Sequence, residues 1–361
     1  RGSIARGDGG GDGGADSTEG GGPPASSSTA GGDVGDGAAA SEEDERQSER
    51  LLEMLRRAGL DLSEGDRSEL PRWSDVASMY GSEPIIVGLD TCERFQTEIP
   101  PPEAYIGPAG TFNSGTNLMA ELLIANCALP EKQKKYGPQR AGMRWQVPWG
   151  KHPPVSQRLH NVGENEKKVV QEHVLPVVTI KDPYFWMGSM CRHRYSASWQ
   201  HTSHCPNLVP SDADRGQGIK GNNEDGGIPV TVKYKDTIVT EHNSLVGHWN
   251  DWYGDYQAVT SFPRLIVRVE DLIFHPEYVT KAVCECGGGK LLYDTVKLIG
   301  DSAKQGGGAV HKGSSGLLSA MARYGNPEKR LDGMTEDDLN FAEKYLRKDL
   351  MEIYGYKLPP R

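Results

Sequence analysis

A loop rich in Gly, Ser and Thr carries the clearest chemical signal in this sequence. The run YIGPAGTFNSGTNLMAELL (105–123) places that loop between a predicted strand and a helix predicted to begin near Gly115. The first turn of a helix offers unpaired N–H groups and the positive end of the helix dipole. Ser114, Thr116 and Asn117 add side-chain donors. The loop therefore predicts a seat for a phosphate or sulfate group, with an ordinary turn and helix cap as the alternative.

The same loop lacks two features of a nucleoside triphosphate site. Gly110 and Gly115 match the glycines of the GxxxxGK[ST] pattern, but Thr116 and Asn117 stand where its Lys and its Ser or Thr would be. The charge for the terminal phosphates and the metal-binding hydroxyl are both missing. A P-loop-type kinase is therefore the less favoured alternative.

A lysine and a serine stand eight residues apart after a second predicted strand. The run VVTIKDPYFWMGSMCRH puts Lys181 at the strand end and Pro183 at the favoured first position of a helix. Two helical turns bring Ser189 back toward the strand end. A cation and a hydroxyl would then share one small site that suits an isolated phosphate. The plain alternative is a solvated lysine and an ordinary helical serine.

Two further segments place a histidine beside a lysine. The segment VPWGKHPPV presents Lys151 and His152 on a stretch stiffened by prolines. A His held on such a loop can act as a general base if its pKa lies near the working pH. The segment GGGAVHKGSSG sets His311, Lys312 and Gly313 in a second Gly-rich loop. That loop predicts another anion seat, or else a plain surface loop.

Alternating strands and helices must position these residues. Four β-rich runs are predicted at 105–110, 175–182, 230–234 and 264–270. Each precedes a predicted helix, at 115–128, 184–198, 239–256 and 275–286. The run VVTI is apolar on both faces, as an interior parallel strand should be. The pattern predicts an α/β domain with a mostly parallel sheet flanked by helices and a P-loop-like strand–loop–helix nucleotide site.

We expect the chain to divide near residue 80. Residues 1–40 hold 14 glycines and almost no large apolar side chain, so they cannot bury enough surface to fold. A short amphipathic helix is predicted at 42–58. The stretch 1–80 is thus predicted to be a flexible low-complexity tail or stalk with a short helix, and 81–361 to be the α/β domain.

Two features of the second half of the chain are also predicted. A Gly-, Asn- and Asp-rich insert at 206–228 is expected to be a long surface loop. A last helix is expected to begin at a capping box formed by Thr335 and Asp338 and to end at Gly355.

The charge distribution and the apolar runs exclude two kinds of partner. Residues 1–50 carry 11 acidic and 4 basic side chains, which accounts for −7 of the formal net charge of −10. The remainder is nearly neutral and has no basic stripe, so nucleic acid is not an expected partner. No apolar run approaches the 18 or so residues of a membrane helix. A membrane is therefore expected as a partner only through an anchor upstream of Arg1.

Six cysteines give no CxxC pair and leave the redox compartment open. They fit a reducing cytosol or a lumen with one or two bridges. Cys191 and Cys205 are predicted to pair in a lumen and to be free buried thiols otherwise. Together with His193, His201 and His204 they form a weaker candidate for a zinc site, because their spacing matches no standard pattern.

Taken in order, residues from about 104 to 356 resemble the sulfotransferases that use 3′-phosphoadenosine 5′-phosphosulfate (PAPS). In that family a PKSGTxx loop holds the 5′-phosphosulfate, and FNSGTNL here is similar to its core. A second motif, Arg-x-Pro followed by a Ser, holds the 3′-phosphate and resembles KDPYFWMGS. The family's RKGxxG loop resembles HKGSSG, and its KTH segment with the catalytic base resembles GKHPP.

The resemblance implies a set of site residues. The implied cofactor-binding residues are Phe112, Asn113, Ser114, Gly115, Thr116, Asn117, Lys181, Ser189, His311, Lys312 and Gly313. The implied catalytic residues are His152 as general base, Asn113 in the place of the family's leaving-group lysine, and Lys151 beside the base. Because Asn113 supplies no charge, Lys151 or Arg144 is expected to provide the missing cation.

The implied reaction moves a sulfuryl group from PAPS to a hydroxyl or amine of a carbohydrate or small-molecule acceptor. Such an in-line displacement depends on positioning and charge stabilisation, and no metal is expected. Trp145, Trp149 and Trp186 lie near the motifs and are expected either to stack on adenine or a sugar ring or to belong to the core.

Two questions stay open at this point. Asn113 favours the alternative of a non-catalytic PAPS-binding or scaffold protein. The Gly-rich tail resembles the stem of Golgi sulfotransferases, which favours a type II Golgi membrane protein with a lumenal domain. The KH segment resembles the cytosolic branch of the family instead, so a cytoplasmic location is the alternative.

Overall fold

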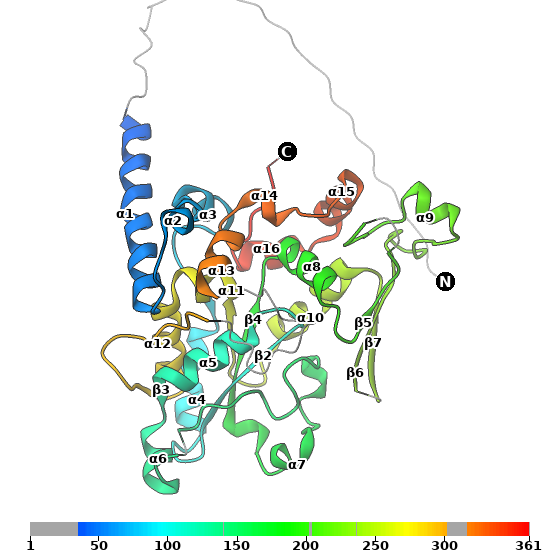
Figure 1. The fold of residues 1–361 in the computed structure, drawn as a ribbon. Helices are drawn as coiled ribbons and strands as arrows, with labels where there is room; N and C mark the ends of the chain where they lie inside the picture. The colour runs from blue at the N-terminus through cyan, green and yellow to red at the C-terminus, as the bar shows by residue number, and fades with distance from the viewer. Residues whose placement is uncertain (1–34, 140, 202–203, 236, 302–315, 361) are drawn as a thin grey trace, which may run out of the picture.

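A four-stranded sheet lies at the centre of the computed structural model, which describes residues 35–139, 141–201, 204–235, 237–301 and 316–360. Its strand order is β1–β8–β4–β2, with bounds β1 (Ile86–Val87), β8 (Leu265–Arg268), β4 (Val174–Ile180) and β2 (Tyr105–Gly110). Strands β8, β4 and β2 are parallel, whereas β1 is antiparallel to β8. Helices flank the sheet, so the prediction of a mostly parallel α/β fold is confirmed (Figure 1).

Strand β4 shows why the sheet is enclosed between two helical layers. All seven of its residues are buried. Successive side chains of a strand point to opposite faces, so Leu175 and Val177 enter one apolar cluster while Val174, Val178 and Ile180 enter the other. A strand that is apolar on both faces needs cover on both faces.

One face of the sheet is covered by three helices with largely aliphatic side chains. They are α4 (Cys92–Glu98), α5 (Thr116–Asn126) and α12 (Pro276–Cys286). A two-stranded antiparallel sheet made of β3 (Cys127–Ala128) and β9 (Lys290–Leu291) follows the ends of α5 and α12. We call this side the aliphatic face.

The opposite face is covered mainly by helices that bury tryptophan and tyrosine, and we call it the aromatic face. Its helices are α1 (Gly35–Arg57), α3 (Trp73–Tyr80), α8 (Pro183–Arg192), α10 (Leu245–Gln257), α11 (Val269–Phe274), α13 (Leu317–Tyr324), α15 (Glu336–Tyr345) and α16 (Lys348–Ile353). The remaining short helices are α2 (Glu64–Ser68), α6 (Pro130–Tyr136), α7 (Gly163–Glu166), α9 (Asp212–Gly216) and α14 (Pro327–Arg330), with 3-10 turns at Leu89–Thr91, Val155–Gln157 and Gln171–His173.

The helix predicted at 42–58 begins earlier than expected and packs on the domain. Leu51 and Leu55 of α1 and Trp73 and Tyr80 of α3 are buried, with at most 3% of each residue exposed. All four belong to the main core cluster. The described part of the segment assigned to the stalk is therefore joined to the domain by apolar packing.

The prediction that 230–234 belongs to the parallel sheet is wrong. This segment is β6 (Val230–Lys235) of a separate antiparallel sheet, in the order β5–β6–β7, with β5 (Ala197–Ser198) and β7 (Ile238–His242). Strand β6 alternates buried and exposed residues, which is the pattern of a sheet with one face in solvent. In Figure 1 this sheet lies on the side of the molecule opposite α1.

Two predicted helices are shorter than expected because their ends are strands of this sheet. The helix predicted at 184–198 ends at Arg192, and the last two residues of the predicted range, Ala197 and Ser198, form β5. The helix predicted at 239–256 begins only at Leu245, where the Ser244 hydroxyl caps it by accepting the Gly247 N–H.

The last predicted helix is broken into two. The capping box of Thr335 and Asp338 is confirmed, and Gly355 ends the pair with φ of 64°. Between them, Leu346 is extended with φ of −60° and ψ of 134°, which separates α15 from α16. The insert predicted as a loop at 206–228 is confirmed except for the single helix α9.

All six cysteines form disulfides, one more bridge than the sequence suggested. The pairs are Cys92–Cys286, Cys127–Cys284 and Cys191–Cys205. The zinc alternative for Cys191 and Cys205 is thereby replaced by the disulfide alternative. Within the described residues, no helix combines the length and apolarity that crossing a membrane requires.

Candidate functional site

The Gly/Ser/Thr loop lies between the end of β2 and the start of α5 and is fastened from inside the domain. The Ser114 hydroxyl donates to the Thr111 carbonyl at 2.8 Å and pairs with the Thr179 hydroxyl of β4 at 3.0 Å. The Thr111 hydroxyl is bonded to the Tyr253 hydroxyl at 2.9 Å. Because Ser114 is fully buried, its hydroxyl holds the loop to β4 and does not face outward.

Two left-handed residues give the loop its shape. Asn113 has φ of 63° and Gly115 has φ of 76°. A Cβ on Gly115 would come within 3.0 Å of Val269, so both the angle and the space favour glycine there. Helix α5 starts directly after it and has no side-chain cap. The N–H groups of its first turn are therefore left for another acceptor.

Lys181 lies against the same loop, at the carboxyl end of the neighbouring parallel strand. Its ammonium donates to the Asn113 carbonyl at 3.2 Å, to the Ser189 hydroxyl at 2.9 Å and to the Tyr324 hydroxyl at 2.6 Å. The loop, Lys181 and Ser189 are thus brought together, as their spacing predicted. The carboxyl ends of parallel strands are where α/β proteins place ligands.

Three more residues join this group that the motifs did not indicate. Arg192 donates to the Ser189 hydroxyl at 2.9 Å from the last turn of α8. Arg323 and Tyr324 arrive on α13, and the charge of Arg323 acts on Arg192. Burial raises the pKa of the Tyr324 hydroxyl, but the charges of Lys181 and Arg192 and the hydrogen bond from Lys181 together lower it by more. The net shift of its pKa is therefore downward. We call Lys181, Arg192 and Arg323 the cation cluster.

The cation cluster has no ion-pair partner in the described part of the chain. Lys181, Arg192 and Arg323 form no salt bridge there, and Lys181 is only 3% exposed. Asp332 acts on Arg192 only at a distance. Glu270 lies close enough to feel the charge of Lys181, but burial and the charge of Asp182 raise its pKa to about 7. An incompletely ionised Glu270 cannot balance three cations, so the cluster favours an anion.

Lys151 lies beside the first turn of α5. Its ammonium donates to the Asn117 side chain at 2.8 Å in the first turn of α5 and lies 4.0 Å from the Trp145 ring centre. Burial lowers the pKa of Lys151 to about 8. Arg144, the other candidate cation, is instead paired with Glu166. Of Lys151 and Arg144, Lys151 is therefore the cation available at the start of α5.

His152 is held in the tautomer that a general base needs. Its Nδ1 lies 2.8 Å from the Gly110 carbonyl, and a carbonyl can only accept, so Nδ1 carries the proton. The lone pair is then on Nε2. Burial lowers the pKa of His152 to about 4, below the range expected above for a general base; the ring is therefore neutral above pH 5 but is a weaker base than an exposed histidine. Its ring centre lies 4.4 Å from that of Phe112.

Buried tryptophans fix the backbone of the site residues. The indole N–H of Trp186 donates to the Phe112 carbonyl at 2.8 Å, and that of Trp249 donates to the Lys181 carbonyl at 3.0 Å. Trp252 donates to the His152 carbonyl at 3.0 Å. Each buried indole thus satisfies its polar group on a residue of the candidate site.

Of the two alternatives for the tryptophans, ligand stacking or core packing, the structure selects core packing for two of them. Trp186 and Trp149 are fully buried, and Trp149 donates to the Tyr256 hydroxyl, so neither can reach a ligand. Trp145 is 42% exposed and stays a candidate. The Asn113 amide donates to the His193 carbonyl at 2.7 Å, which ties the loop to the segment after α8.

One predicted part of the site lies outside the described residues. This part consists of His311, Lys312 and Gly313. Among the residues that are described, no group of three or more His, Cys, Asp or Glu side chains could hold a metal ion. Compared with family models, with curated proteins and with solved structures, the chain matches none of them.

Proposed function

We propose that this protein is a sulfotransferase that moves a sulfuryl group from PAPS to a hydroxyl group of a carbohydrate or small-molecule acceptor. The observation that carries the proposal is the cation cluster beside an uncapped helix start. Lys181 and Arg192 converge on the Ser189 hydroxyl, next to the loop at the end of β2. A ligand with two anionic ends fits two neighbouring seats of this kind.

In this proposal the loop is a P-loop-like seat for the 5′-phosphosulfate. The N–H groups of the first turn of α5 would bind its oxygens, and Lys151 would supply the charge that Asn113 lacks. Lys181, Ser189 and Arg192 would bind the 3′-phosphate. Tyr324 would exchange its bond to Lys181 for a bond to the phosphate.

His152 would act as the general base. Nε2 takes the proton of the acceptor hydroxyl while the acceptor oxygen forms a bond to sulfur. The bond between sulfur and the bridging phosphate oxygen breaks, and adenosine 3′,5′-bisphosphate leaves with the electron pair. The bond from Nδ1 to the Gly110 carbonyl keeps Nε2 unprotonated and ready for this step.

The three disulfides support an oxidising compartment as the place of action. Disulfides that persist are typical of lumenal and extracellular proteins and are rare in the cytosol. Of the two locations considered, a Golgi-type lumen is therefore the one we propose.

Binding and turnover can be tested separately. Calorimetry with adenosine 3′,5′-bisphosphate measures the nucleotide site, and transfer of radiolabelled sulfuryl from PAPS to a panel of hydroxyl acceptors measures the reaction. Lys181→Ala should weaken bisphosphate binding by about 100-fold, since it removes a charged donor. His152→Ala should lower the transfer rate by about 100-fold or more and leave bisphosphate affinity unchanged.

Matched controls come from the same chain. Lys348→Ala removes an exposed lysine of α16, and His160→Ala removes an exposed histidine of the loop that carries His152. Both controls should behave as the unmodified protein. A protein that binds no bisphosphate would refute the proposal.

A non-catalytic PAPS-binding protein is the second candidate, and one observation favours it. The Asn113 amide, which stands where the family has a leaving-group lysine, is engaged with the His193 carbonyl. Tight bisphosphate binding without transfer to any acceptor class would select this alternative.

A further inference from the structure

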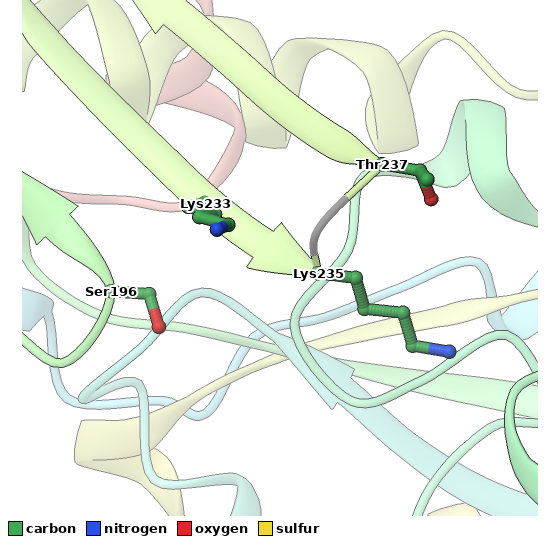
Figure 2. A pocket seen from close by; sticks show the side chains of 4 residues that line it. All are labelled: Ser196, Lys233, Lys235 and Thr237. Atoms are coloured by element: carbon green, nitrogen blue, oxygen red, sulfur yellow. The ribbon is translucent and has the colours of Figure 1, made fainter.

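An open pocket of about 530 Å³ lies on the β5–β6–β7 sheet, outside the site described above. Figure 2 shows the side chains that line it, which are Ser196, Lys233, Lys235 and Thr237. Asp236 stands between the last two and is not among the residues that the structure describes, so the net charge around this pocket is not defined. We therefore assign no ligand to this pocket.

Glu270 is a buried carboxylate beside the candidate site that the proposed reaction does not use. It lies in the first turn of α11, two residues after β8 ends at Arg268. Ile180, the last residue of β4, pairs in register with Arg268. Because the two strands are parallel, Glu270 comes to lie beside Asp182, which directly follows Lys181. No part of Glu270 is exposed.

Both carboxylate oxygens of Glu270 are hydrogen-bonded. Oε1 accepts the Asp182 N–H at 3.1 Å, and Oε2 accepts the Tyr356 hydroxyl at 2.9 Å. The Asp182 side chain is held separately by Arg330, at 2.6 Å. Glu270 therefore fixes the backbone directly after Lys181 and ties it to the C-terminal segment.

The charged groups that face Glu270 come from the two strand ends. They are Lys181, Asp182 and Arg268, of which Asp182 is paired with Arg330 and Arg268 with Asp271. The phenols that feel its charge are Tyr80 of α3, Tyr253 of α10, Tyr324 of α13 and Tyr356. Since Asp182 and Arg268 are each engaged in an ion pair, the attraction to Lys181 is the one that an anion bound to Lys181 would change.

Glu270 stands between opposing influences. Burial and the charge of Asp182 raise its pKa to about 7, whereas the charge of Lys181 lowers it. An anion bound to Lys181 offsets that charge and repels a second negative charge, so it favours the protonated acid. The protonated acid keeps both contacts. Oε1 still accepts the Asp182 N–H, and the proton on Oε2 is donated to the Tyr356 oxygen, because a hydroxyl is both donor and acceptor.

We propose that Glu270 is a positioning residue of the 3′-phosphate seat and takes up a proton from solvent when the phosphate binds Lys181. Ionised Glu270 attracts the Lys181 ammonium and competes with the phosphate for it, whereas protonated Glu270 leaves that charge to the phosphate. In both states the carboxyl group holds the backbone after Lys181. The affinity for the phosphate therefore falls as the pH rises through about 7. This inference rests on the proposed function and adds its control by pH.

The test measures binding of adenosine 3′,5′-bisphosphate to the full chain by calorimetry between pH 6.5 and pH 8.5. Glu270→Gln mimics the protonated acid, because its amide oxygen can accept the Asp182 N–H and its amide N–H can donate to Tyr356. The affinity of the unmodified protein should fall about fivefold more over this range than that of Glu270→Gln. The exposed Glu328→Gln removes the same charge and should keep the full decline.

Proton uptake is measured at pH 7.5 by repeating the titrations in two buffers that differ in ionisation enthalpy. The unmodified protein should take up about half a proton more per bisphosphate than Glu270→Gln does. Lys151 also titrates near this pH, but it does so in both proteins and leaves the difference unchanged. Lys151→Arg, which keeps the charge and does not titrate in this range, should still take up about half a proton.

A purely structural role of Glu270 would change the affinity by the same factor at every pH. Parallel pH profiles of Glu270→Gln and the unmodified protein, or equal proton uptake by the two, would refute this inference and leave the proposed function intact. If Glu270→Gln does not fold, Lys151→Arg decides, since binding without proton uptake would refute the inference in the same way. A protein that binds no bisphosphate at any pH would refute the proposed function and this inference with it.

Discussion

The two faces of the central sheet are packed with different types of side chain. Apart from Phe95, the buried cluster of the aliphatic face consists of Ala, Ile, Leu, Val, Met and Cys. Two disulfides fasten α12 there, to α4 and to β3. The aromatic face instead buries tryptophans whose N–H groups bond to the backbone of Phe112, Lys181 and His152.

This difference separates stability from function. Aliphatic packing is non-directional, and the two disulfides of this face lie away from the candidate site. Both stabilise the fold without setting the position of a site atom. A hydrogen bond has a required distance and angle, so an indole that donates to a site carbonyl also sets its position. Changes to the aliphatic face should therefore lower stability alone, and changes to the aromatic face should alter ligand affinity.

The largest expected effect is the loss of a disulfide from the aliphatic face. Because Cys127–Cys284 stays intact, Cys92→Ala/Cys286→Ala opens a loop of about 37 residues (92–127 and 284–286), which should cost about 4 kcal/mol in the free energy of unfolding. Urea unfolding measures the loss. Cys191→Ala/Cys205→Ala, with a separation of 14 residues, should cost about 3 kcal/mol. Equal midpoints for both variants would contradict the expectation.

The next effect comes from Glu270 under the cation cluster. Its folded-state pKa is about 7, above the value of an unfolded chain, so the folded protein holds this proton more tightly. The stability that this provides at low pH is lost as the pH rises from about 4.5 through 7, by about 3 kcal/mol.

Glu270→Gln should therefore remove that part of the decline in unfolding free energy between pH 5 and pH 8. The exposed Glu328→Gln serves as its control and should leave the decline unchanged. An identical pH profile for Glu270→Gln and the unmodified protein would show that Glu270 is not responsible.

Val283→Ala on α12 should show the behaviour of the aliphatic face in isolation. Val283 is fully buried, and its truncation should cost about 2 kcal/mol in the free energy of unfolding. The affinity for adenosine 3′,5′-bisphosphate should not change at a temperature where the variant is folded. A large drop in that affinity would mean that the two faces are coupled.

The smallest effect should come from Trp249→Phe on the aromatic face. Without the indole N–H, the Lys181 carbonyl loses its donor, and bisphosphate affinity should fall about fivefold, or about 1 kcal/mol. Trp149→Phe is the matched control, because its N–H donates to Tyr256 and not to a site residue. If both variants lose the same affinity, the indole of Trp249 has no positioning role.

The parts of the fold and site that were predictable are those set by local sequence. The loop after β2 follows from its glycines, and the approach of Lys181 to Ser189 follows from a strand end and two helical turns. Which sheet a strand joins is not a local property. The segment at 230–234 has a strand pattern, but only its pairing with β5 and β7 shows that it lies outside the central sheet.

Residues far apart in sequence were the ones that escaped prediction. Tyr324 bonds to Lys181 across 143 residues, and no spacing rule connects them. Arg192 is different, since it stands three residues after Ser189 and one helical turn brings the two together. It could have been found by following α8 one turn further.

The spacing of the two cysteines on α12 has a practical consequence. Cys284 and Cys286 are two positions apart on a helix, so their side chains point to nearly opposite sides of its axis, about 160° apart. For the two cysteines to exchange disulfide partners, α12 would have to rotate by about half a turn about its own axis, which would expose its apolar residues. A peptide map of the protein under non-reducing conditions, read for Cys92–Cys286 against Cys92–Cys284, thus reports how α12 is rotated in any preparation or variant.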